Sequence, residues 1–425
     1  MPSYALKRAA GTRGSVVVDR CQVCGGTDLR PILFVGYLPP VNTMPRIGTP
    51  PSEEPSYPAQ VLKCATCELV QLGLVVDPAI LFPPEYPYTS GTTRILRENF
   101  AELAHEANSL LGLEKDDLVV DIGSNDGTLL GNFKEAGQRV LGIEPTDTGK
   151  LAIERGIPTE IAFFTPDVAR RVRKEHGPAR VVTAANVFAH IEDVHSVVAG
   201  ILEMLPPDGV FISESHYWLG LVETLQYDTI YHEHLRYYSL TALRNLFAMH
   251  GLEIFHAKRI PTHGGSIRVY AARRGQRKAT AAVAELLATE ARELNDARLR
   301  EFVRGVVSAK LGLYTLLDEV KGKGARVFGV GAPSRASTLI NYVGLDDGIV
   351  DCVLEIKGSH KIGKYVPGTL IPVVDEQRLF DEQPDYALLF SWHIADELMP
   401  KLAQRGFKGR FIVPLPTARV VAGIA

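Results

Sequence analysis

The chain has 425 residues, of which 46% are hydrophobic and 22% charged, and its formal net charge is −3. This composition is typical of a globular protein with ample core, and the length predicts two to three domains of roughly 100–200 residues each. The slightly acidic balance disfavours a nucleic acid partner, which selects a basic surface. No apolar stretch approaches the roughly 18 residues of a membrane span, and the N-terminus lacks the apolar core of a signal peptide. We therefore expect a cytoplasmic protein.

Four of the five cysteines form two C-x-x-C pairs near the start of the chain. Two such pairs supply the four thiolates of a structural zinc site, which leaves no coordination position open for a substrate. A redox role is the alternative, but two pairs without a thioredoxin-like context favour the metal. The proline-rich stretch 39–58 is expected to be an extended loop, and the isolated Cys352 a core thiol. The predicted zinc ligands are Cys21, Cys24, Cys64 and Cys67.

A hinge rich in proline and aromatic residues, 77–93, precedes an amphipathic stretch, 94–111, that predicts a helix. The apolar run 118–122 then predicts a buried parallel strand, which turns through Gly123 and Gly127. Glycine lets the backbone approach a ligand at this turn, because no Cβ stands in the way. The spacing G-x-x-x-G differs from the G-x-G-x-x-G of dinucleotide folds, so no pyrophosphate cradle is indicated.

A second apolar run, 140–143, delivers Glu144 to the carboxyl end of the next strand, where an open α/β sheet places the acid that binds a ribose diol. A strand that ends in D-x-G, with an acid after the second strand, is similar to the S-adenosylmethionine (SAM) site of class I methyltransferases. A Rossmann-like turn that serves another ligand, or none, is the alternative. This pattern and the end of the third apolar run, at Asn186, together predict the residues that contact the cofactor. They are Asp121, Gly123, Asn125, Asp126, Glu144, Pro145, Asn186 and Phe188.

Strand and helix signals alternate as far as residue 275, with strands indicated at 181–188 and 209–215. Two further runs, 252–260 and 265–274, predict antiparallel strands that close the edge of the sheet. After a helical stretch, 277–322, the pattern strand, glycine turn and helix returns at 325–342 and indicates a second α/β domain. The predicted fold is therefore α/β, with a zinc-binding module at 1–76, a central class I methyltransferase domain with its hinge at 77–275, and a helical linker with a C-terminal Rossmann-like domain at 276–425.

The segment 227–240, Y-D-T-I-Y-H-E-H-L-R-Y-Y-S-L, is rich in histidines, phenols and acidic residues. A catalytic histidine needs neighbouring polar groups that orient its ring, and this segment offers them. Metal binding by H-x-H is one alternative, but on a helix the two imidazoles point about 200° apart. A structural cluster of aromatic residues with satisfied histidines is the other. Downstream, T-H-G-G-S-I-R-V-Y, 262–270, fits a clamp for an anionic or hydroxyl-rich ligand and equally a bulged hairpin. Asn186 is expected to line the path of the transferred carbon, whereas His190 alone fits a helix cap as well.

One ordered set of motifs runs along nearly the whole chain from Cys21. It consists of the two C-x-x-C pairs, E-Y-P-Y-T-S-G-T-T, D-I-G-S-N-D-G-T-L-L, N-V-F-A-H-I, Y-H-E-H-L-R-Y-Y-S-L, H-G-G-S-I-R, F-G-V-G-A-P-S-R-A-S-T-L-I-N-Y, G-K-Y-V-P-G-T-L-I-P and S-W-H-I-A-D-E-L. This set resembles the zinc-containing sugar C-methyltransferases, which act on nucleotide-linked deoxysugars in bacterial antibiotic pathways.

The resemblance implies SAM and a structural zinc ion as cofactors, and a C-terminal domain that helps to bind the sugar nucleotide. It implies that His234 is the base, with Glu233 beside it. The other catalytic residues that it implies are Tyr231, His190 and a hinge tyrosine, either Tyr86 or Tyr88. The expected substrate-binding residues are His263, Arg268, Ser334, Arg335, Lys364, Tyr365 and His393.

The chemistry follows from the acidity of a carbon next to a ketone. Removal of the C3 proton of a 4-keto hexose gives an enolate that is nucleophilic at carbon, and phenol or imidazole donors would stabilise its oxyanion. The resemblance indicates C3 and dTDP, although C5 also neighbours the ketone; the identity of the sugar and the oligomeric state stay open. One departure is visible, since this chain has Arg335-Ala336-Ser337 where related chains commonly carry Lys-Gly-Asn. A changed phosphate contact, or a different nucleotide or sugar, is the consequence we expect.

Three other functions are alternatives to a sugar C-methyltransferase. One is a zinc-ribbon methyltransferase that acts on RNA, protein or another small molecule. For RNA or protein it would need a basic, aromatic-studded face, and the acidic net charge without a Lys/Arg run disfavours this. A non-catalytic sugar-nucleotide-binding protein would not need Asp121, Glu144 and the E-H pair. An oxidoreductase that binds NAD at Gly329 and Gly331 would need an acid about 20 residues on, for which Asp346 or Asp347 is only a loose match.

Overall fold

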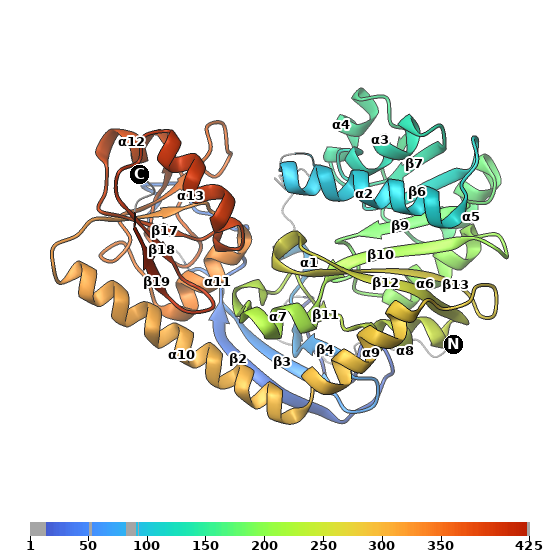
Figure 1. Cartoon of the computed structure of the whole chain (residues 1–425), viewed down its shortest axis with the longest axis horizontal. Coiled ribbons are helices and arrows are strands. Elements are labelled where there is room, and N and C mark those ends of the chain that lie inside the picture. Colours follow the sequence, from blue (N-terminus) through green and yellow to red (C-terminus); the bar gives the residue numbers. More distant parts are fainter. Residues whose placement is uncertain (1–13, 51–52, 82–90, 92, 423–425) are drawn as a thin grey trace.

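The computed structural model describes residues 14–50, 53–81, 91 and 93–422 (Figure 1). Within them the chain forms a four-stranded N-terminal sheet, a seven-stranded central sheet and a six-stranded C-terminal sheet. The hinge tyrosines Tyr86 and Tyr88 lie outside the described residues. None of the described helices combines the length and the apolar character that a membrane crossing needs.

The N-terminal sheet has the strand order β11-β4-β3-β2, and β11 comes from far along the chain. It pairs antiparallel with β4, so that Arg236 lies opposite Gln71. Because β11 directly follows the Y-H-E-H segment, this pairing fixes that segment against the cysteine-bearing module. Its strands are β2 (Leu29–Leu38), β3 (Tyr57–Cys64), β4 (Val70–Leu72) and β11 (Arg236–Tyr237). Beside it, β1 (Val16–Val17) and β5 (Leu74–Val75) form a separate two-stranded sheet, and α1 (Pro78–Leu81) follows.

The central sheet has the order β12-β13-β10-β9-β6-β7-β8, in which only β13 runs antiparallel to its neighbours. This arrangement confirms the predicted class I methyltransferase fold, including the antiparallel pair at its edge. The elements are α2 (Arg94–Leu111), β6 (Leu118–Ile122), α3 (Thr128–Glu135), β7 (Arg139–Ile143), α4 (Thr148–Glu154), β8 (Thr159–Glu160), α5 (Pro166–His176), β9 (Val181–Ala185), α6 (Val194–Met204), β10 (Val210–His216), α7 (Trp218–Thr224), α8 (Leu240–Met249), β12 (Leu252–Ile260) and β13 (Ser266–Arg273).

Side chains of β6 alternate between the two faces of this sheet, as the period of a strand requires. Val119 lies in a core with Phe100 of α2 and Phe133 of α3, whereas Val120 and Ile122 lie in the core that contains residues of α5, α6 and α8. Burial of each such side chain contributes roughly 1.5–3 kcal/mol to the free energy of folding. Helices therefore cover both faces, and the carboxyl ends of the parallel strands remain as the edge where an open α/β sheet binds its ligands.

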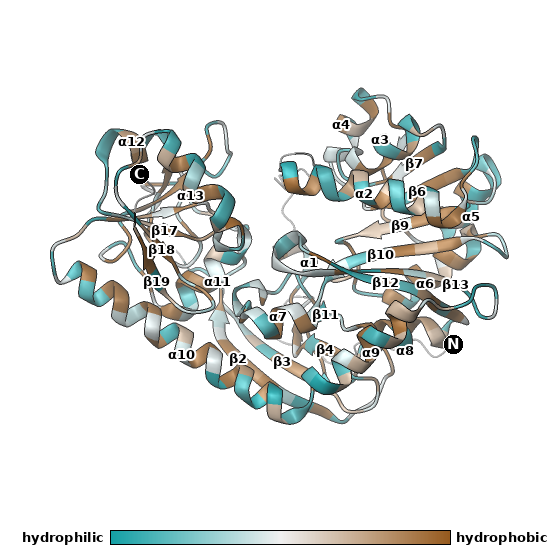
Figure 2. Ribbon diagram, viewed as in Figure 1, coloured by the Kyte–Doolittle hydropathy of each residue, from teal (hydrophilic) through white to brown (hydrophobic). Residues whose placement is uncertain are grey.

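The C-terminal sheet has the order β16-β15-β14-β17-β18-β19, parallel except for β19. The long helix α10 runs beside the N-terminal sheet toward this unit (Figure 1) and has the mixed hydrophilic and hydrophobic colouring of an amphipathic helix (Figure 2). The elements are α9 (Ala281–Glu293), α10 (Asp296–Lys321), β14 (Val327–Val330), α11 (Ser334–Val343), β15 (Cys352–Glu355), β16 (Val373–Asp375), α12 (Gln377–Glu382), β17 (Tyr386–Leu389), α13 (Ala395–Gln404), β18 (Arg410–Val413) and β19 (Arg419–Val421).

The structure differs from one expectation about local structure. β9 ends at Ala185, because Asn186 adopts a φ of +60° and leaves the sheet, so the strand is shorter than the predicted 181–188. The Y-H-E-H segment forms a turn rather than a helix. His232 and His234 nevertheless point to different partners, the carbonyl oxygens of Pro58 and Thr229. The predicted core thiol Cys352 is buried.

Candidate active site

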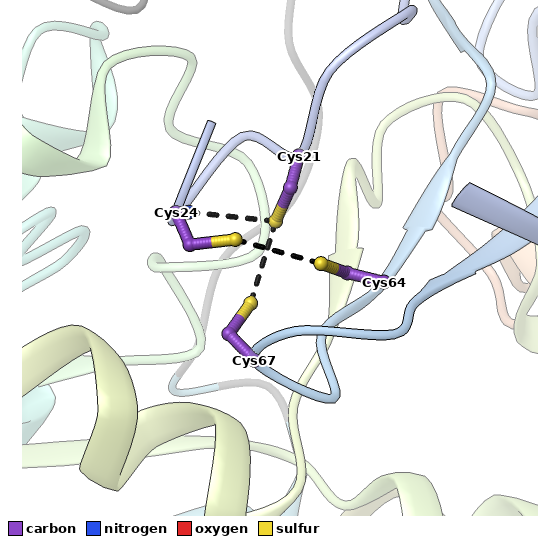
Figure 3. Close-up of side chains that lie close together, drawn as sticks. All are labelled: Cys21, Cys24, Cys64 and Cys67. Atoms are coloured by element: carbon purple, nitrogen blue, oxygen red, sulfur yellow. Dashed lines mark hydrogen bonds between the residues drawn. The ribbon is translucent and has the colours of Figure 1, made fainter. Parts of the chain in front are cut away.

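The four cysteines predicted to bind zinc converge in the structure (Figure 3). Their sulfur atoms lie within 4.8 Å of one another, with Sγ–Sγ distances of 3.4 Å for Cys21–Cys67 and 3.5 Å for Cys24–Cys64. The hydrogen bond with Cys67 lowers the pKa of the Cys21 thiol to about 5. Four zinc–sulfur bonds of about 2.3 Å give sulfur–sulfur edges of about 3.8 Å, so this donor set fits a structural zinc ion.

Two central helices attach this cysteine cluster to the methyltransferase unit. The side-chain amide of Asn245 in α8 donates to the Cys67 carbonyl at 3.0 Å. The ring of His195 in α6 bonds through Nε2 to the Val23 carbonyl, between the first two cysteines, at 2.7 Å. A closed set of four thiolates buried at such a junction supports the fold and leaves the chemistry to other residues.

The predicted cofactor turn folds tightly at the carboxyl end of β6. Gly123 has a φ of +68°, and an added Cβ would lie 2.6 Å from Cγ2 of Val187. Asn125 also lies in the left-handed region, with a φ of +51°, and its backbone N–H donates to Oε2 of Glu144 at 3.0 Å. A hydrogen bond therefore joins the turn after the first strand to the acid after the second. Any residue other than glycine at position 123 would place its Cβ against Val187 and disturb this turn.

The three acids of the pattern have different surroundings. Asp121 is buried and accepts a hydrogen bond from Thr183 Oγ1 at 2.6 Å, and burial raises its pKa to about 7. Glu144 also accepts from the backbone and hydroxyl of Thr146 at 2.9 and 2.6 Å. Asp126 receives the backbone N–H of Gly91 at 3.0 Å and the hydroxyl of Thr128 at 2.7 Å. Asp126 thus ties the end of the hinge to the start of α3.

The remaining predicted cofactor residues divide into two groups. Asn186 has a buried Oδ1 without a hydrogen-bond partner in the described part of the chain, and it stands where β9 meets the open edge of the sheet. Pro145 is half-buried directly after Glu144. Phe188, by contrast, is 0% exposed and packs against Phe211 and Phe247 in the core. Its predicted contact with the cofactor is corrected accordingly, since a side chain so enclosed offers no surface to a ligand.

Within the described residues, His234 is held at one ring nitrogen. Its Nδ1 lies 2.9 Å from the carbonyl oxygen of Thr229, so Nδ1 carries the hydrogen and Nε2 is left as the basic nitrogen. The ring of Tyr231 stacks on it at a centroid distance of 4.2 Å. The neighbouring Glu233 is buried and accepts from Nδ2 of Asn42, in the loop after β2, at 2.6 Å. The N-terminal module thereby contributes to the surroundings of the predicted base.

Further imidazoles surround His234. The ring of His190 lies 5.0 Å from it, the ring of His216 also 5.0 Å, and His263 lies 5.2 Å beyond His216. Burial is the main reason that their pKa values fall, to about 3 for His234 and about 4 for His190 and His263. At neutral pH these rings are uncharged, so each can accept one hydrogen bond or proton and donate another.

Arg268 does not line this site. It is 0% exposed and donates to Glu214 at 3.1 Å and to Glu106 of α2 at 2.9 Å. The predicted role in substrate binding is therefore corrected: every contact found for Arg268 joins α2 to the sheet. Its neighbour in sequence, His263, does line the site, with a φ of +55° in the turn before β13.

The other predicted substrate residues lie on the C-terminal unit. Ser334 and Arg335 begin α11, and Arg335 is 6% exposed and ion-paired with Asp228. His393 lies in a short 3-10 helix, Trp392–Ile394, beside Arg335 and His263. Lys364 and Tyr365 pair with the loop after β2, where the Tyr365 backbone N–H donates to the Pro45 carbonyl at 2.8 Å. They dock the N-terminal module onto the C-terminal unit.

Sequence reasoning missed three participants. His216 ends β10 in E-S-H-Y, where a single histidine after a buried strand carries no local signal. Asn42 lies in the loop after β2 and meets Glu233 only through the fold. Glu355 ends β15 and accepts the Ala332 backbone N–H at 2.8 Å. The C-terminal unit therefore also has an acid at the end of its second strand. This acid is Glu355, and not Asp346 or Asp347, which the sequence suggested. For Glu355 the sequence carries a signal, because this acid directly follows the apolar run 352–354.

Comparison with protein families covers most of the chain in three consecutive parts. Residues 21–82 match a zinc binding domain, residues 95–257 a methyltransferase domain, and residues 261–416 a C-methyltransferase C-terminal domain. Among curated proteins, C-methyltransferase NovU of Streptomyces niveus is 34% identical over 412 residues, which are 95% of this chain and 97% of that protein.

Two solved structures resemble parts of the chain. Magnesium protoporphyrin IX methyltransferase from Synechocystis PCC 6803, with bound SAH, is 18% identical and covers 42% of this chain and 83% of its own, with a TM-score of 0.34. The PH0226 protein from Pyrococcus horikoshii OT3 is 15% identical and covers 47% of this chain and 97% of its own, with a TM-score of 0.36.

Proposed function

This chain belongs to the C-methyltransferase family with an N-terminal zinc-binding module, and we propose that its substrate is a nucleotide-linked 4-keto deoxysugar. It is a SAM-dependent C-methyltransferase. The proposal adds the dTDP-linked sugar, C3 as the carbon that is methylated, and an enolate formed by His234. The observation that carries it is the orientation of His234: the Thr229 carbonyl binds Nδ1, and no described residue binds Nε2.

His234 is assigned as the base that removes the C3 proton. The C3–H bond breaks, the proton goes to Nε2, and the electron pair remains on the sugar as the enolate. Burial lowers the pKa of His234 to about 3, so the ring is unprotonated at neutral pH. A carbon beside a ketone is acidic, so a neutral imidazole can remove its proton. A positioned general base accelerates such a proton transfer by about 10²–10⁴-fold.

The groups around His234 are assigned to the oxyanion and to positioning. The Tyr231 hydroxyl is the donor proposed for the enolate oxygen, since its ring lies against His234. His190, predicted for the same role, also lies against His234, but its N–H is bound by the backbone of Glu233, so the other nitrogen of the neutral ring accepts. Glu233 is assigned to positioning, because its carboxylate is bound to Asn42. Tyr86 or Tyr88 would add a phenol from the hinge, outside the described residues.

The turn at Gly123 and the acid Glu144 are proposed to hold SAM, and the unpartnered Oδ1 of Asn186 supports this place for a polar ligand. When bound, SAM supplies an electrophilic methyl group to the nucleophilic carbon, and S-adenosylhomocysteine (SAH) and one proton are the by-products. Asp121 and Glu144 bind and orient; neither is required to transfer a proton. Asp126 is assigned to fastening the loop that carries Gly91.

The C-terminal unit is proposed to bind the nucleotide. Its turn repeats the central one: the Ala332 N–H donates to Glu355 at 2.8 Å, as the Asn125 N–H donates to Glu144 at 3.0 Å. The ε-ammonium of Lys361 donates to the Ala332 carbonyl at 2.5 Å, which places a cation at this turn. A glycine turn before a helix, with a cation beside it, suits a phosphate.

Deuterium exchange at C3 tests the proposal. A dTDP-4-keto-2,6-dideoxy sugar is incubated in deuterated buffer with SAH and enzyme, and loss of the C3 proton is followed by NMR. Exchange with the wild type and none with His234→Gln, at unchanged SAH affinity, is the expected result. His232→Gln is the matched control, since that ring lies in the same turn but bonds the Pro58 carbonyl. Exchange that persists in His234→Gln, or binding of NAD in place of SAM, would contradict it.

A further inference from the structure

A buried ion pair joins the C-terminal unit to the central unit beside the histidines. Arg335, at the start of α11, donates from Nε and Nη2 to the two carboxylate oxygens of Asp228, both at 2.8 Å. Trp392 donates its indole N–H to the same carboxylate at 2.7 Å, and its ring lies 4.9 Å from the guanidinium carbon. The guanidinium matches a carboxylate with two parallel bonds, so this contact fixes orientation as well as distance.

Asp228 stands directly before the residue that orients the base. The Thr229 carbonyl accepts the Nδ1 hydrogen of His234 at 2.9 Å, and the next carbonyl, that of Ile230, accepts the hydroxyl of Thr338 in α11 at 3.2 Å. Two contacts from one helix of the C-terminal unit therefore bracket the carbonyl that selects the tautomer of His234. A base whose tautomer is wrong cannot accept the proton, however close it stands.

The same guanidinium holds a second segment of the site. Nη2 of Arg335 also donates to Oε1 of Gln226 at 3.1 Å, and the amide of Gln226 donates to the Gly264 carbonyl at 2.6 Å. Gly264 adjoins His263, whose ring is the outer member of the row of imidazoles. One side chain of the C-terminal unit thus supports the backbone beside two members of that row, His234 and His263.

Resting on the proposed function, we propose that Arg335 and Asp228 form a clamp through which the C-terminal unit orients His234. Both are positioning residues, because their polar groups bind each other and not the reacting carbon. This role replaces the phosphate contact predicted for Arg335, whose Nε and Nη2 are already occupied. It also gives the Arg335-Ala336-Ser337 departure a function, since a lysine at this place would have no fork with which to hold Asp228.

Two variants test the clamp without relying on a single destabilised protein. Arg335→Lys keeps the charge but loses the fork. The double variant Asp228→Asn with Arg335→Gln removes both charges, which avoids leaving one of them buried and unpaired. Glu382→Gln is the control, because it breaks the ion pair with Arg326 within the C-terminal unit. Circular dichroism and thermal melting establish that each protein is folded.

The main readout is the tautomer of His234, from ¹⁵N NMR of histidine-labelled protein with SAH bound, which does not require turnover. The wild type and Glu382→Gln should show Nδ1–H; both clamp variants should show a mixture of tautomers. With the keto sugar, kcat and C3 exchange should fall by roughly 10- to 100-fold while the Kd for SAH is unchanged. Folded clamp variants that retain the Nδ1–H tautomer and wild-type kcat would overturn the clamp. A wild type with that tautomer but no C3 exchange would instead count against the proposed function.

Discussion

Gly123→Ala tests whether the turn after β6 is a cofactor site, and its cost can be worked out from the geometry. The residue has a φ of +68°, where an alanine costs about 1–2 kcal/mol. Its new Cβ would lie 2.6 Å from Cγ2 of Val187. Relieving such a clash costs about 1–3 kcal/mol more, so the total loss of folding free energy is about 2–5 kcal/mol.

Gly112→Ala is a matched control for the backbone alone. Gly112 has a φ of +61°, and nothing lies within 4 Å of its added Cβ. Its expected cost is therefore only the backbone contribution of about 1–2 kcal/mol. The difference between the two variants isolates the contact between the turn and Val187, the residue after Asn186.

Urea unfolding and calorimetric titration with SAH provide the two measurements. The clash forces the turn or Val187 to shift. If the cofactor contacts this turn, the clash energy of about 1–3 kcal/mol is lost from SAH binding. At about 1.4 kcal/mol for each factor of ten, the affinity for SAH should fall by about 5- to 150-fold. Gly112→Ala should bind SAH as the wild type does. Equal SAH affinity in the two variants would refute the assignment of this turn to the cofactor.

Three other predictions concern the metal, pH and Arg268. Metal analysis should find one zinc ion per chain, and Cys64→Ser should lose it together with several degrees of melting temperature; a zinc-free protein of full stability would contradict this. Burial keeps His190, His232, His234 and His263 neutral in the folded state, so the stability that this gives is present above pH 6.5 and is lost as pH drops toward 4, by about 1.4 kcal/mol per histidine and pH unit. Protonation of Asp121, whose pKa is raised to about 7, acts in the opposite direction. Urea unfolding should still show a net loss of stability between pH 7.5 and 5.5, whereas a flat profile would refute these histidine environments. Arg268→Gln leaves Glu214 buried and unpaired, which costs about 3–5 kcal/mol, while the KM for the sugar should not change; a raised KM at full stability would restore the substrate role.

Local patterns in the sequence were sufficient for much of the fold. The helix α2 and the strand β6 have the bounds that hydrophobic periodicity predicts, because both periods are properties of a single segment. The conformation of the Y-H-E-H segment, by contrast, is not a property of the segment alone. Its conformation is set by β11, which pairs with a strand of the N-terminal module that the segment alone does not reveal.

The site was predictable where one segment carries the chemistry and not where several meet. His234 and Glu144 stand in dense motifs, whereas His216 is a single histidine that becomes informative only beside His234 and His263. Arg268 was assigned to substrate because its motif is polar, but its partners are acids of α2, far away in sequence. Burial of a charge depends on what the fold brings to it, and that information is not local.

The most direct test of the whole account is a single turnover with ¹³C-methyl SAM and a dTDP-4-keto-2,6-dideoxy sugar, followed by NMR of the product. We expect the label on C3, joined to carbon, with one SAH formed per methyl transferred and no transfer by His234→Gln. A label on oxygen, or transfer to C3 at wild-type rate by His234→Gln, would contradict the account.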